Sequence, residues 1–101
     1  MRTIVILQPT NKHGTKTAYS KFRTALFQDG FERIGLDIFM RVDTNRKTAE
    51  KRRRRMAEAI PNTGRILLFT MTEKQWGRIE YLAGGPDYQE IIVGANSSIL
   101  L

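Results

Sequence analysis

The segment from Phe31 to Asp43 constrains the fold more than any other, because its apolar residues recur at every second position. The apolar even positions are Ile34, Leu36, Ile38, Met40 and Val42, and between them stand Arg33, Gly35, Asp37 and Arg41. Side chains of a β-strand point alternately to the two faces of its sheet. The pattern therefore predicts a long strand that buries one face and bends near Gly35, within a sheet that other segments must complete.

Further strands are predicted on both sides of this segment. Thr3–Leu7 is a short, β-branched, apolar run before Pro9, which is typical of a buried central strand. The other predicted strands are Arg65–Met71, Arg78–Ala83 and Glu90–Val93. The residues Thr72–Gln75 are predicted to form a polar turn between the first two of them.

Two segments instead repeat apolar residues at intervals of three and four, the pattern of an amphipathic helix. The first begins at Thr17, after a loop, and Gly30 follows it as a cap; its apolar face is Ala18, Tyr19, Phe22, Ala25 and Leu26. The second follows an N-cap within residues 43–45 and runs to about Ile60. On this second helix, Arg53 falls on the apolar stripe, whereas Arg52, Arg54 and Arg55 are expected to point outward.

The order of these elements predicts an α+β fold of the ferredoxin-like βαββαβ type, with an extra C-terminal strand. With 101 residues, the chain suffices for one domain. Residues 1–84 would form this domain, and residues 85–101 a strand and tail. Two helices cover only one sheet face, so the apolar residues Ile91, Ile92 and Val93 are expected to dock a second copy or a second protein. The alternative is that they cover the chain's own sheet.

The net positive charge lies entirely in the first sixty residues. These hold 14 Lys and Arg against 6 Asp and Glu, whereas residues 61–101 hold 3 against 4. Within Arg46–Arg55 there are seven basic residues and one acid, Glu50. Such a density attracts polyanions by releasing their counterions, so nucleic acid is the expected partner. An acidic membrane surface and a solvated helix face are the alternatives.

Other chemistries have little support in the sequence. There is no cysteine, and the longest apolar run is far shorter than the roughly 20 residues of a membrane span, so a soluble, cytoplasmic protein is expected. The acids are scattered singly and predict no metal site. His13, in a loop beside lysines, is expected to be a phosphate contact or a residue without a functional role rather than a catalytic base. Trp76 and Tyr81 are expected to be core residues.

A set of short strings then occurs in the order and spacing of a known family: Tyr19-x-x-Phe22-Arg23-x-x-Leu26 before Asp29-Gly30-Phe31, Ile38-Phe39-x-Arg41, Ala49-Glu50, Ile60-Pro61-x-x-Gly64 and Leu68-Phe69-Thr70-Met71-Thr72-Glu73-Lys74-Gln75-Trp76. These strings resemble the CRISPR-associated protein two family, the small subunit of spacer acquisition, in the form found beside single-effector, DNA-cutting (type II) systems. The resemblance covers about residues 1–84.

The resemblance implies a ferredoxin-like homodimer that positions DNA. Two dimers of the integrase subunit, CRISPR-associated protein one, would grip it and hold a short DNA duplex for insertion into the repeat array. The basic residues that would lie along the phosphates are Lys12, Lys16, Arg23, Arg41, Arg52, Arg54 and Arg55. Phosphate contacts are independent of sequence, which suits a protein that accepts any spacer. The C-terminal strand would add to a sheet edge to dock the partner.

The resemblance also implies a metal-dependent nuclease, which uses an Asp at the end of the first strand to bind Mg²⁺. This chain has Gln8 there, and a neutral amide lacks the charge that a hard divalent ion requires. We therefore expect no cofactor and no catalytic residue at Gln8. The alternatives are a metal-dependent endonuclease or endoribonuclease that uses another acid, with Asp37 as the candidate, and a ferredoxin-like RNA-binding protein unrelated to spacer acquisition.

Overall fold

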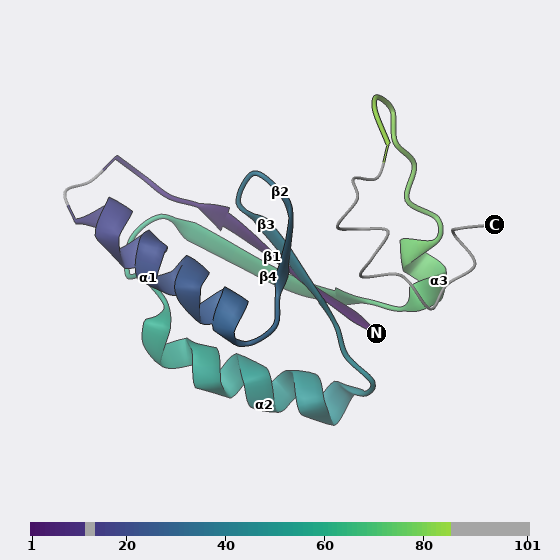
Figure 1. The fold of residues 1–101 in the computed structure, drawn as a ribbon, viewed down its shortest axis with the longest axis horizontal. Coiled ribbons are helices and arrows are strands. Elements are labelled where there is room, and N and C mark those ends of the chain that lie inside the picture. Colours follow the sequence, from purple (N-terminus) through teal and green to yellow (C-terminus); the bar gives the residue numbers. More distant parts are fainter. Residues whose placement is uncertain (12–13, 86–101) are drawn as a thin grey trace.

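A four-stranded antiparallel sheet forms the centre of the chain, and two helices cover one of its faces (Figure 1). This computed structural model describes residues 1–11 and 14–85. The strands are β1 (Arg2–Gln8), β2 (Glu32–Gly35), β3 (Ile38–Val42) and β4 (Arg65–Met71), and they lie in the order β2-β3-β1-β4. The covering helices are α1 (Thr15–Gln28) and α2 (Arg46–Met56). The predicted α+β, ferredoxin-like fold is confirmed. The predicted strand Glu90–Val93 lies outside the described residues.

The core forms between the helices and the central strand. Val5 of β1 lies between Phe39 of β3 and Leu68 of β4 in the sheet register, and all three point toward the helices. From the helices come Tyr19, Phe22, Leu26 and Met56, each at most 5% exposed. Burying an apolar side chain of this size contributes about 1.5–3 kcal/mol, so the layer between the helices and the sheet is a main source of hydrophobic stabilisation.

The segment predicted as one bent strand is a hairpin, so that prediction is wrong in its topology. Strands β2 and β3 pair with each other, and Gly35 stands opposite Ile38, with Leu36 and Asp37 between them. Asp37 has a φ of 56°, a conformation that Asp tolerates better than most residues. Leu36 is 86% exposed at the tip. The alternating pattern continues through the turn and therefore conceals it.

Both predicted helices are present, with small shifts at their ends. Helix α1 begins at Thr15, two residues earlier than predicted, and ends before Gly30, whose φ of 86° and backbone hydrogen bond to Phe27 confirm it as the cap. Asn45 caps α2, because its side chain accepts a hydrogen bond from the backbone of Thr48. A short 3-10 turn, η1 (Ala57–Ala59), completes the predicted run to Ile60.

Two predictions after β4 are wrong. The predicted polar turn is a short helix, α3 (Glu73–Trp76), because the side chains of Thr72 and Gln75 cap each other's backbone. The predicted strand Arg78–Ala83 is absent from the described chain. The backbone of Arg78 and Ile79 continues the helical turn, Leu82 is 97% exposed, and none of the four strands that the structure describes pairs with this segment.

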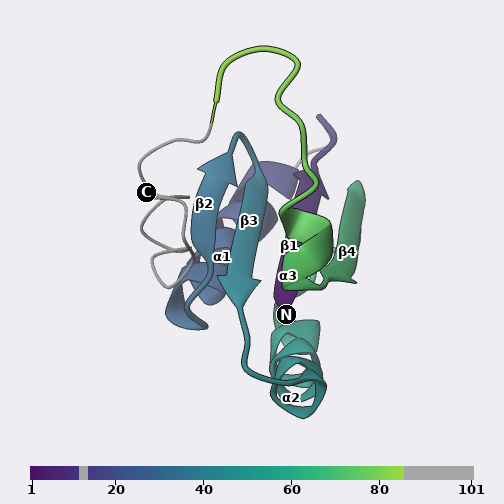
Figure 2. The same ribbon diagram turned by 90° about the vertical axis from the view of Figure 1, so that its right-hand side faces the viewer.

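Helix α3 is held at one end of the sheet by a buried arginine of β1. Arg2 is 2% exposed and projects from the face opposite α1 and α2. Its Nε donates to Glu73 at 2.6 Å, and its guanidinium lies 4.5 Å from the centre of the Trp76 ring. An ion pair and a cation–π contact thus fix the chain that leaves β4. Figure 2 shows α3 at this end of the sheet, near the N-terminus.

A second buried ionic cluster joins the helices to the sheet. Asp43 is 4% exposed; its carboxylate accepts hydrogen bonds from Arg41 at 2.9 Å and Thr3 at 3.4 Å, and lies 3.2 Å from Nε of Arg52. Both arginines also donate to the backbone carbonyl of Asp29, at the end of α1. The Asp43 cluster (Thr3, Asp29, Arg41, Asp43 and Arg52) therefore connects β1, β3, α1 and α2.

We predict that Asp43→Ala lowers the free energy of unfolding by about 3–5 kcal/mol, because it leaves two largely buried guanidinium groups without their carboxylate. Urea denaturation at neutral pH measures the effect. Glu50→Ala, on an exposed position of α2, is the matched control and should change the free energy by less than about 0.5 kcal/mol. Equal effects of the two substitutions would contradict the role given to the Asp43 cluster.

Candidate nucleic-acid interface

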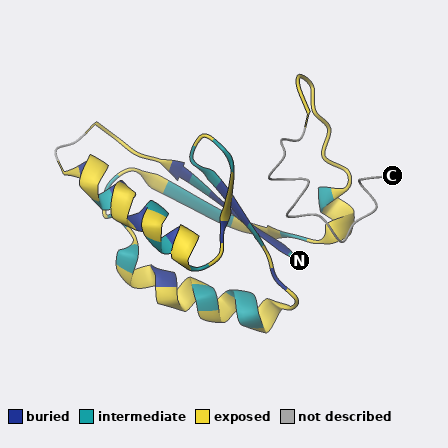
Figure 3. Cartoon of the chain, in the orientation of Figure 1, coloured by how far each residue is buried: buried dark blue, intermediate teal, exposed yellow. Residues whose placement is uncertain are grey.

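The outer face of α2 presents four exposed cations. These are Lys47, Lys51, Arg54 and Arg55, which follow one another at intervals that bring them to one side of the helix. None of the four has an ion-pair partner within residues 1–11 and 14–85. Figure 3 shows that most of α2 is exposed. The outer α2 face is therefore a surface on which positive charge is not neutralised by the described chain.

Three of the arginines predicted to contact nucleic acid are paired within the fold. Arg23 donates to both carboxylate oxygens of Asp37, at 2.8 and 3.0 Å. Arg41 and Arg52 belong to the Asp43 cluster, and their side chains are 20% and 19% exposed. The expectation that Arg52 points outward is wrong, because two acids from other elements draw it inward.

Arg53 falls on the apolar stripe of the helix, where its side chain can either extend past the edge of the core or pair with an acid. In the structure the side chain is exposed and lines the rim of a cavity between α2 and the sheet. The long aliphatic stem allows the charged group to remain in water while the helix face approaches the strands.

A second group of polar residues surrounds the entrance to α1. A shallow cavity of about 350 Å³ lies there, lined by Pro9, Thr10, Asn11, Thr15, Lys16, Tyr19 and Arg23. Lys16 is exposed in the first turn of α1. Lys12, which the sequence predicts as a phosphate contact, and His13 lie outside the described residues. The cavity combines hydroxyl, amide and cationic groups, which suits an anion better than a metal ion.

Gln8 is the last residue of β1 and is exposed beside this cavity. The turn residue Asp37 lies next to the same strand end, because its backbone carbonyl accepts a hydrogen bond from Leu7 at 2.8 Å. The carboxylate of Asp37 is occupied by Arg23, and Arg33 lies 3.8 Å away. A neutral amide and a carboxylate paired with arginines do not fit Mg²⁺, which binds through anionic oxygens free to replace water.

The other acidic residues of the described chain do not form an alternative metal site. Among the described residues, no group of three or more His, Asp or Glu side chains converges in a way that could hold a metal ion. The structure likewise contains, in its described part, no helix long and apolar enough to cross a membrane.

Tyr19 lies at the base of the cavity and is fully buried. Its hydroxyl donates to the backbone carbonyl of Thr63 at 2.7 Å. Burial raises the pKa of Tyr19 above its ordinary value of 10.0; nearby Arg23 opposes the rise and Asp37 adds to it. The hydrogen bond to Asp37 raises the pKa of Arg23 further, so Arg23 stays charged. Tyr19 therefore acts as a neutral structural donor.

The two aromatic residues after β4, Trp76 and Tyr81, differ in how far they are buried. Trp76 is partly buried and one face of its ring is covered by Arg2, as expected for a packing residue. Tyr81 is 43% exposed, so the expectation that it belongs to the core is wrong.

The prediction from sequence missed Lys47 and Lys51 as members of the outer α2 face. The signal was present, because both precede Arg54 and Arg55 at helical spacing on the same side. The continuous run Arg52–Arg55 does not define one face, because adjacent residues on a helix point in different directions.

The fold and this surface define a class of protein: a small ferredoxin-like domain with an exposed cationic helix. Comparison with known proteins narrows the class, because residues 10–79 match the family described as CRISPR associated protein Cas2. The chain belongs to this family, and the resemblance found in the sequence is confirmed.

Curated relatives agree with this assignment. The chain is 31% identical to a protein of Acidovorax ebreus over 96 residues, which cover 94% of each chain. It is 30% identical to a protein of Ligilactobacillus salivarius over 102 residues, covering both chains fully, and 34% identical over 88 residues to one of Streptococcus mutans, covering 86% of this chain and 81% of that one. All three carry the name "CRISPR-associated endoribonuclease Cas2".

We predict that Tyr19→Phe lowers the free energy of unfolding by about 1 kcal/mol at pH 7, since the mutant cannot form the hydrogen bond to Thr63. Because the folded-state pKa of Tyr19 is raised, its contribution is complete below about pH 10 and falls as the pH rises through the folded pKa. Urea denaturation at pH 7 and at about pH 11 should therefore show a smaller difference from wild type at the higher pH. A difference that grows with pH would contradict this.

Proposed function

We propose that this chain is a non-catalytic, DNA-positioning subunit of the CRISPR spacer-acquisition complex. It acts as a homodimer, binds duplex DNA through the outer α2 face and associates with the integrase subunit, CRISPR-associated protein one. The observation that carries the proposal is the outer α2 face, with four cations that no acid of the described chain neutralises.

The geometry of these cations supports binding of a backbone rather than of bases. They lie along one helix on the outside of the domain, where a duplex can approach without entering a cleft. Contacts of Lys and Arg with phosphates supply affinity and register but carry no sequence information. A subunit that holds DNA of any sequence requires this mode of binding.

The sheet face opposite α1 and α2 supports the homodimer. Ile38, Leu67 and Phe69 lie on this face and alternate along their strands with residues that face the two helices. Ile4 and Met40 on the same face are buried, but Phe69 is 43% exposed and Val42 is 39% exposed, so part of the face is open. Apolar sheet faces of this kind are stabilised when a second layer covers them.

The residues at the end of β1 support a non-catalytic role, because they lack the metal-binding Asp that the family resemblance implies at this position. Gln8 supplies no charge, and the neighbouring Asp37 carboxylate is held by Arg23. The positive groups around this strand end favour a phosphate over a divalent cation.

We predict that Arg54→Glu/Arg55→Glu weakens binding of a short DNA duplex by roughly tenfold or more at moderate salt. The slope of log affinity against log salt should fall by about 0.9 for each DNA phosphate that the variant no longer neutralises. Fluorescence anisotropy over a range of salt concentrations measures both quantities. Gln8→Ala should leave them unchanged.

The matched control is Lys74→Glu/Arg78→Glu, which makes the same change of net charge at exposed positions in and just after α3. It should reduce the affinity much less than the change on α2. Equal losses of affinity from the two pairs would show that binding follows net charge alone, and the outer α2 face would then not be the DNA site.

A second candidate function is a metal-dependent endonuclease or endoribonuclease, which the names of the relatives favour. It requires an acid other than the residue at position 8, and Asp37 is the nearest candidate. This function predicts cleavage of RNA or DNA in Mg²⁺ or Mn²⁺ that stops with a chelator and is reduced at least tenfold by Asp37→Asn. Purified protein that cleaves neither substrate with any divalent ion would exclude it.

A further inference from the structure

A cavity of about 200 Å³, which we call the α2 cavity, lies between α2 and the sheet. Its base is apolar and is formed by Phe31, Ala49, Met56 and Leu68. The volume is that of roughly six or seven water molecules, and an apolar protein cavity of about 150 Å³ already admits benzene. The α2 cavity is therefore large enough to hold a small organic molecule.

Two residues of α2 leave this space unfilled. Ala49 and Arg53 lie on the stripe of the helix that also carries the buried Met56. The side chain of Ala49 is a single methyl group, and the side chain of Arg53 is exposed at the rim, so neither fills the space beside Leu68. An unfilled apolar cavity lowers the stability of a fold. The sequence of α2 thus keeps open a space that a larger apolar residue would fill.

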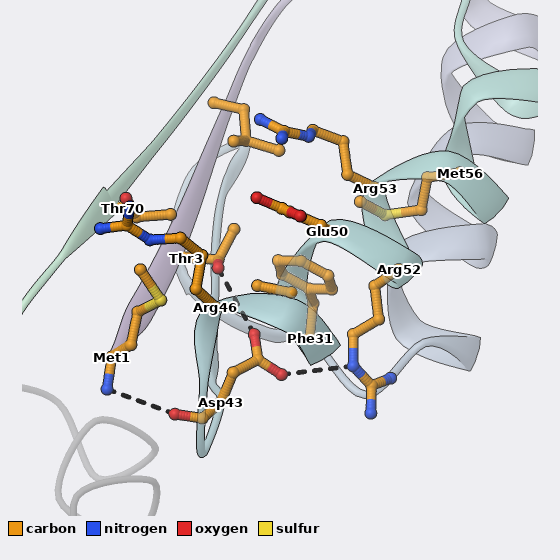
Figure 4. A pocket seen from close by; sticks show the side chains of 12 residues that line it. Met1, Thr3, Phe31, Asp43, Arg46, Glu50, Arg52, Arg53, Met56 and Thr70 are labelled. Carbon is orange, nitrogen blue, oxygen red and sulfur yellow. Dashed lines mark hydrogen bonds and ion pairs between the residues drawn. The ribbon is translucent and has the colours of Figure 1, made fainter.

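The entrance to the α2 cavity carries three charged residues of the helix, Arg46, Glu50 and Arg53, which we call the inner rim. They follow one another at intervals of four and three residues and so lie on one side of α2. Figure 4 shows all three extending from α2 toward the strands. The inner rim shares no residue with the outer α2 face, so a ligand bound here does not occupy the proposed DNA site.

The charges of the inner rim are not balanced by the fold. In the described chain, neither Arg46 nor Arg53 pairs with an acid, and Glu50 pairs with no cation. Together the three residues carry a net charge of one positive unit. One carboxylate between the arginines would make the group neutral, and guanidinium groups bind carboxylates through charge-assisted, often paired hydrogen bonds. A dianion would exceed the positive charge and would also lie beside Glu50.

We propose that the α2 cavity binds a small monocarboxylate with an apolar body, an aromatic or branched aliphatic acid of about ten non-hydrogen atoms. The carboxylate lies between Arg46 and Arg53. The apolar body contacts Phe31, Met56 and Leu68 at the base. An apolar cavity with a few polar groups at one end is the usual construction of a small-molecule site.

A ligand in this position joins the helix to the sheet. Met56 belongs to α2 and Leu68 to β4, so both elements contact the same molecule. The complete site exists only while α2 lies on the sheet, and the ligand therefore stabilises that arrangement by mass action. The midpoint of thermal unfolding should accordingly rise with the concentration of the ligand.

Three small molecules of matched structure test the carboxylate and the apolar body separately. Phenylacetate has both, phenylacetamide has a neutral amide in place of the carboxylate, and acetate lacks the ring. Phenylacetate should bind the full chain with a Kd of about 0.1–1 mM, as expected for a ligand of this size. Phenylacetamide and acetate should bind roughly tenfold more weakly or worse. Titrations followed by the methyl NMR signals of Met56 and Leu68 measure all three affinities.

Substitutions in the cavity test its location and its charge. Arg46→Gln/Arg53→Gln should weaken phenylacetate binding by roughly tenfold or more, because both cations are lost. Glu50→Gln should strengthen it by roughly two- to fivefold, since the negative charge beside the ligand is removed. Ala49→Leu should abolish binding, because the larger side chain fills the cavity. Circular dichroism and thermal unfolding check that each variant is folded.

The matched control is Lys74→Gln/Arg78→Gln, which makes the same change of net charge at exposed positions in and just after α3. It should bind phenylacetate like wild type. Phenylacetate that causes no saturable shift of the methyl signals overturns the proposal, and so does equal affinity for phenylacetamide. Equal losses in the inner-rim variant and the control also overturn it. If Ala49→Leu does not fold, the exposed inner-rim positions decide the outcome.

Discussion

The carboxylate of Asp43 is the contact on which the arrangement of the two helices depends. It stands at the end of β3, yet it binds Arg52 from α2 and, through the two arginines, the end of α1. The apolar core alone leaves the position of α2 weakly specified, because Met56 is the one buried residue of that helix. A buried charge network of this kind fixes the position of α2 because any other position would leave charges without partners.

The same ion pairs determine which basic side chains are available to contact a polyanion. Arg41 and Arg52 are held by Asp43, and Arg23 is held by Asp37, so formal charge overstates the positive field available at the surface. The positive charge that these acids do not pair is concentrated on α2. One side of this helix faces solvent, and the other faces the cavity between α2 and the sheet. The same helix thus offers two differently shaped cationic surfaces, one open and one recessed.

Much of the fold could be predicted from local patterns. The apolar run of β1, the helical spacing around Phe22 and an N-cap within residues 43–45 are each encoded within a few residues, and the structure has all three, with Asn45 as the cap. The turn at Asp37 could not be found, because alternation does not change where a strand reverses. Nor could the inward direction of Arg52, since its partners Asp29 and Asp43 become neighbours only after folding.

The composition of α2 has a consequence for its own stability. Consecutive arginines repel one another, and an isolated helix of 11 residues is marginal in water, so α2 depends on its anchoring at Met56 and Arg52. Its local opening therefore costs less free energy than that of the central strands. A polyanion that binds the helix only in its folded form shifts this local equilibrium by mass action. Binding of a polyanion to the outer α2 face and the folded fraction of α2 are therefore coupled, so that a rise in one raises the other.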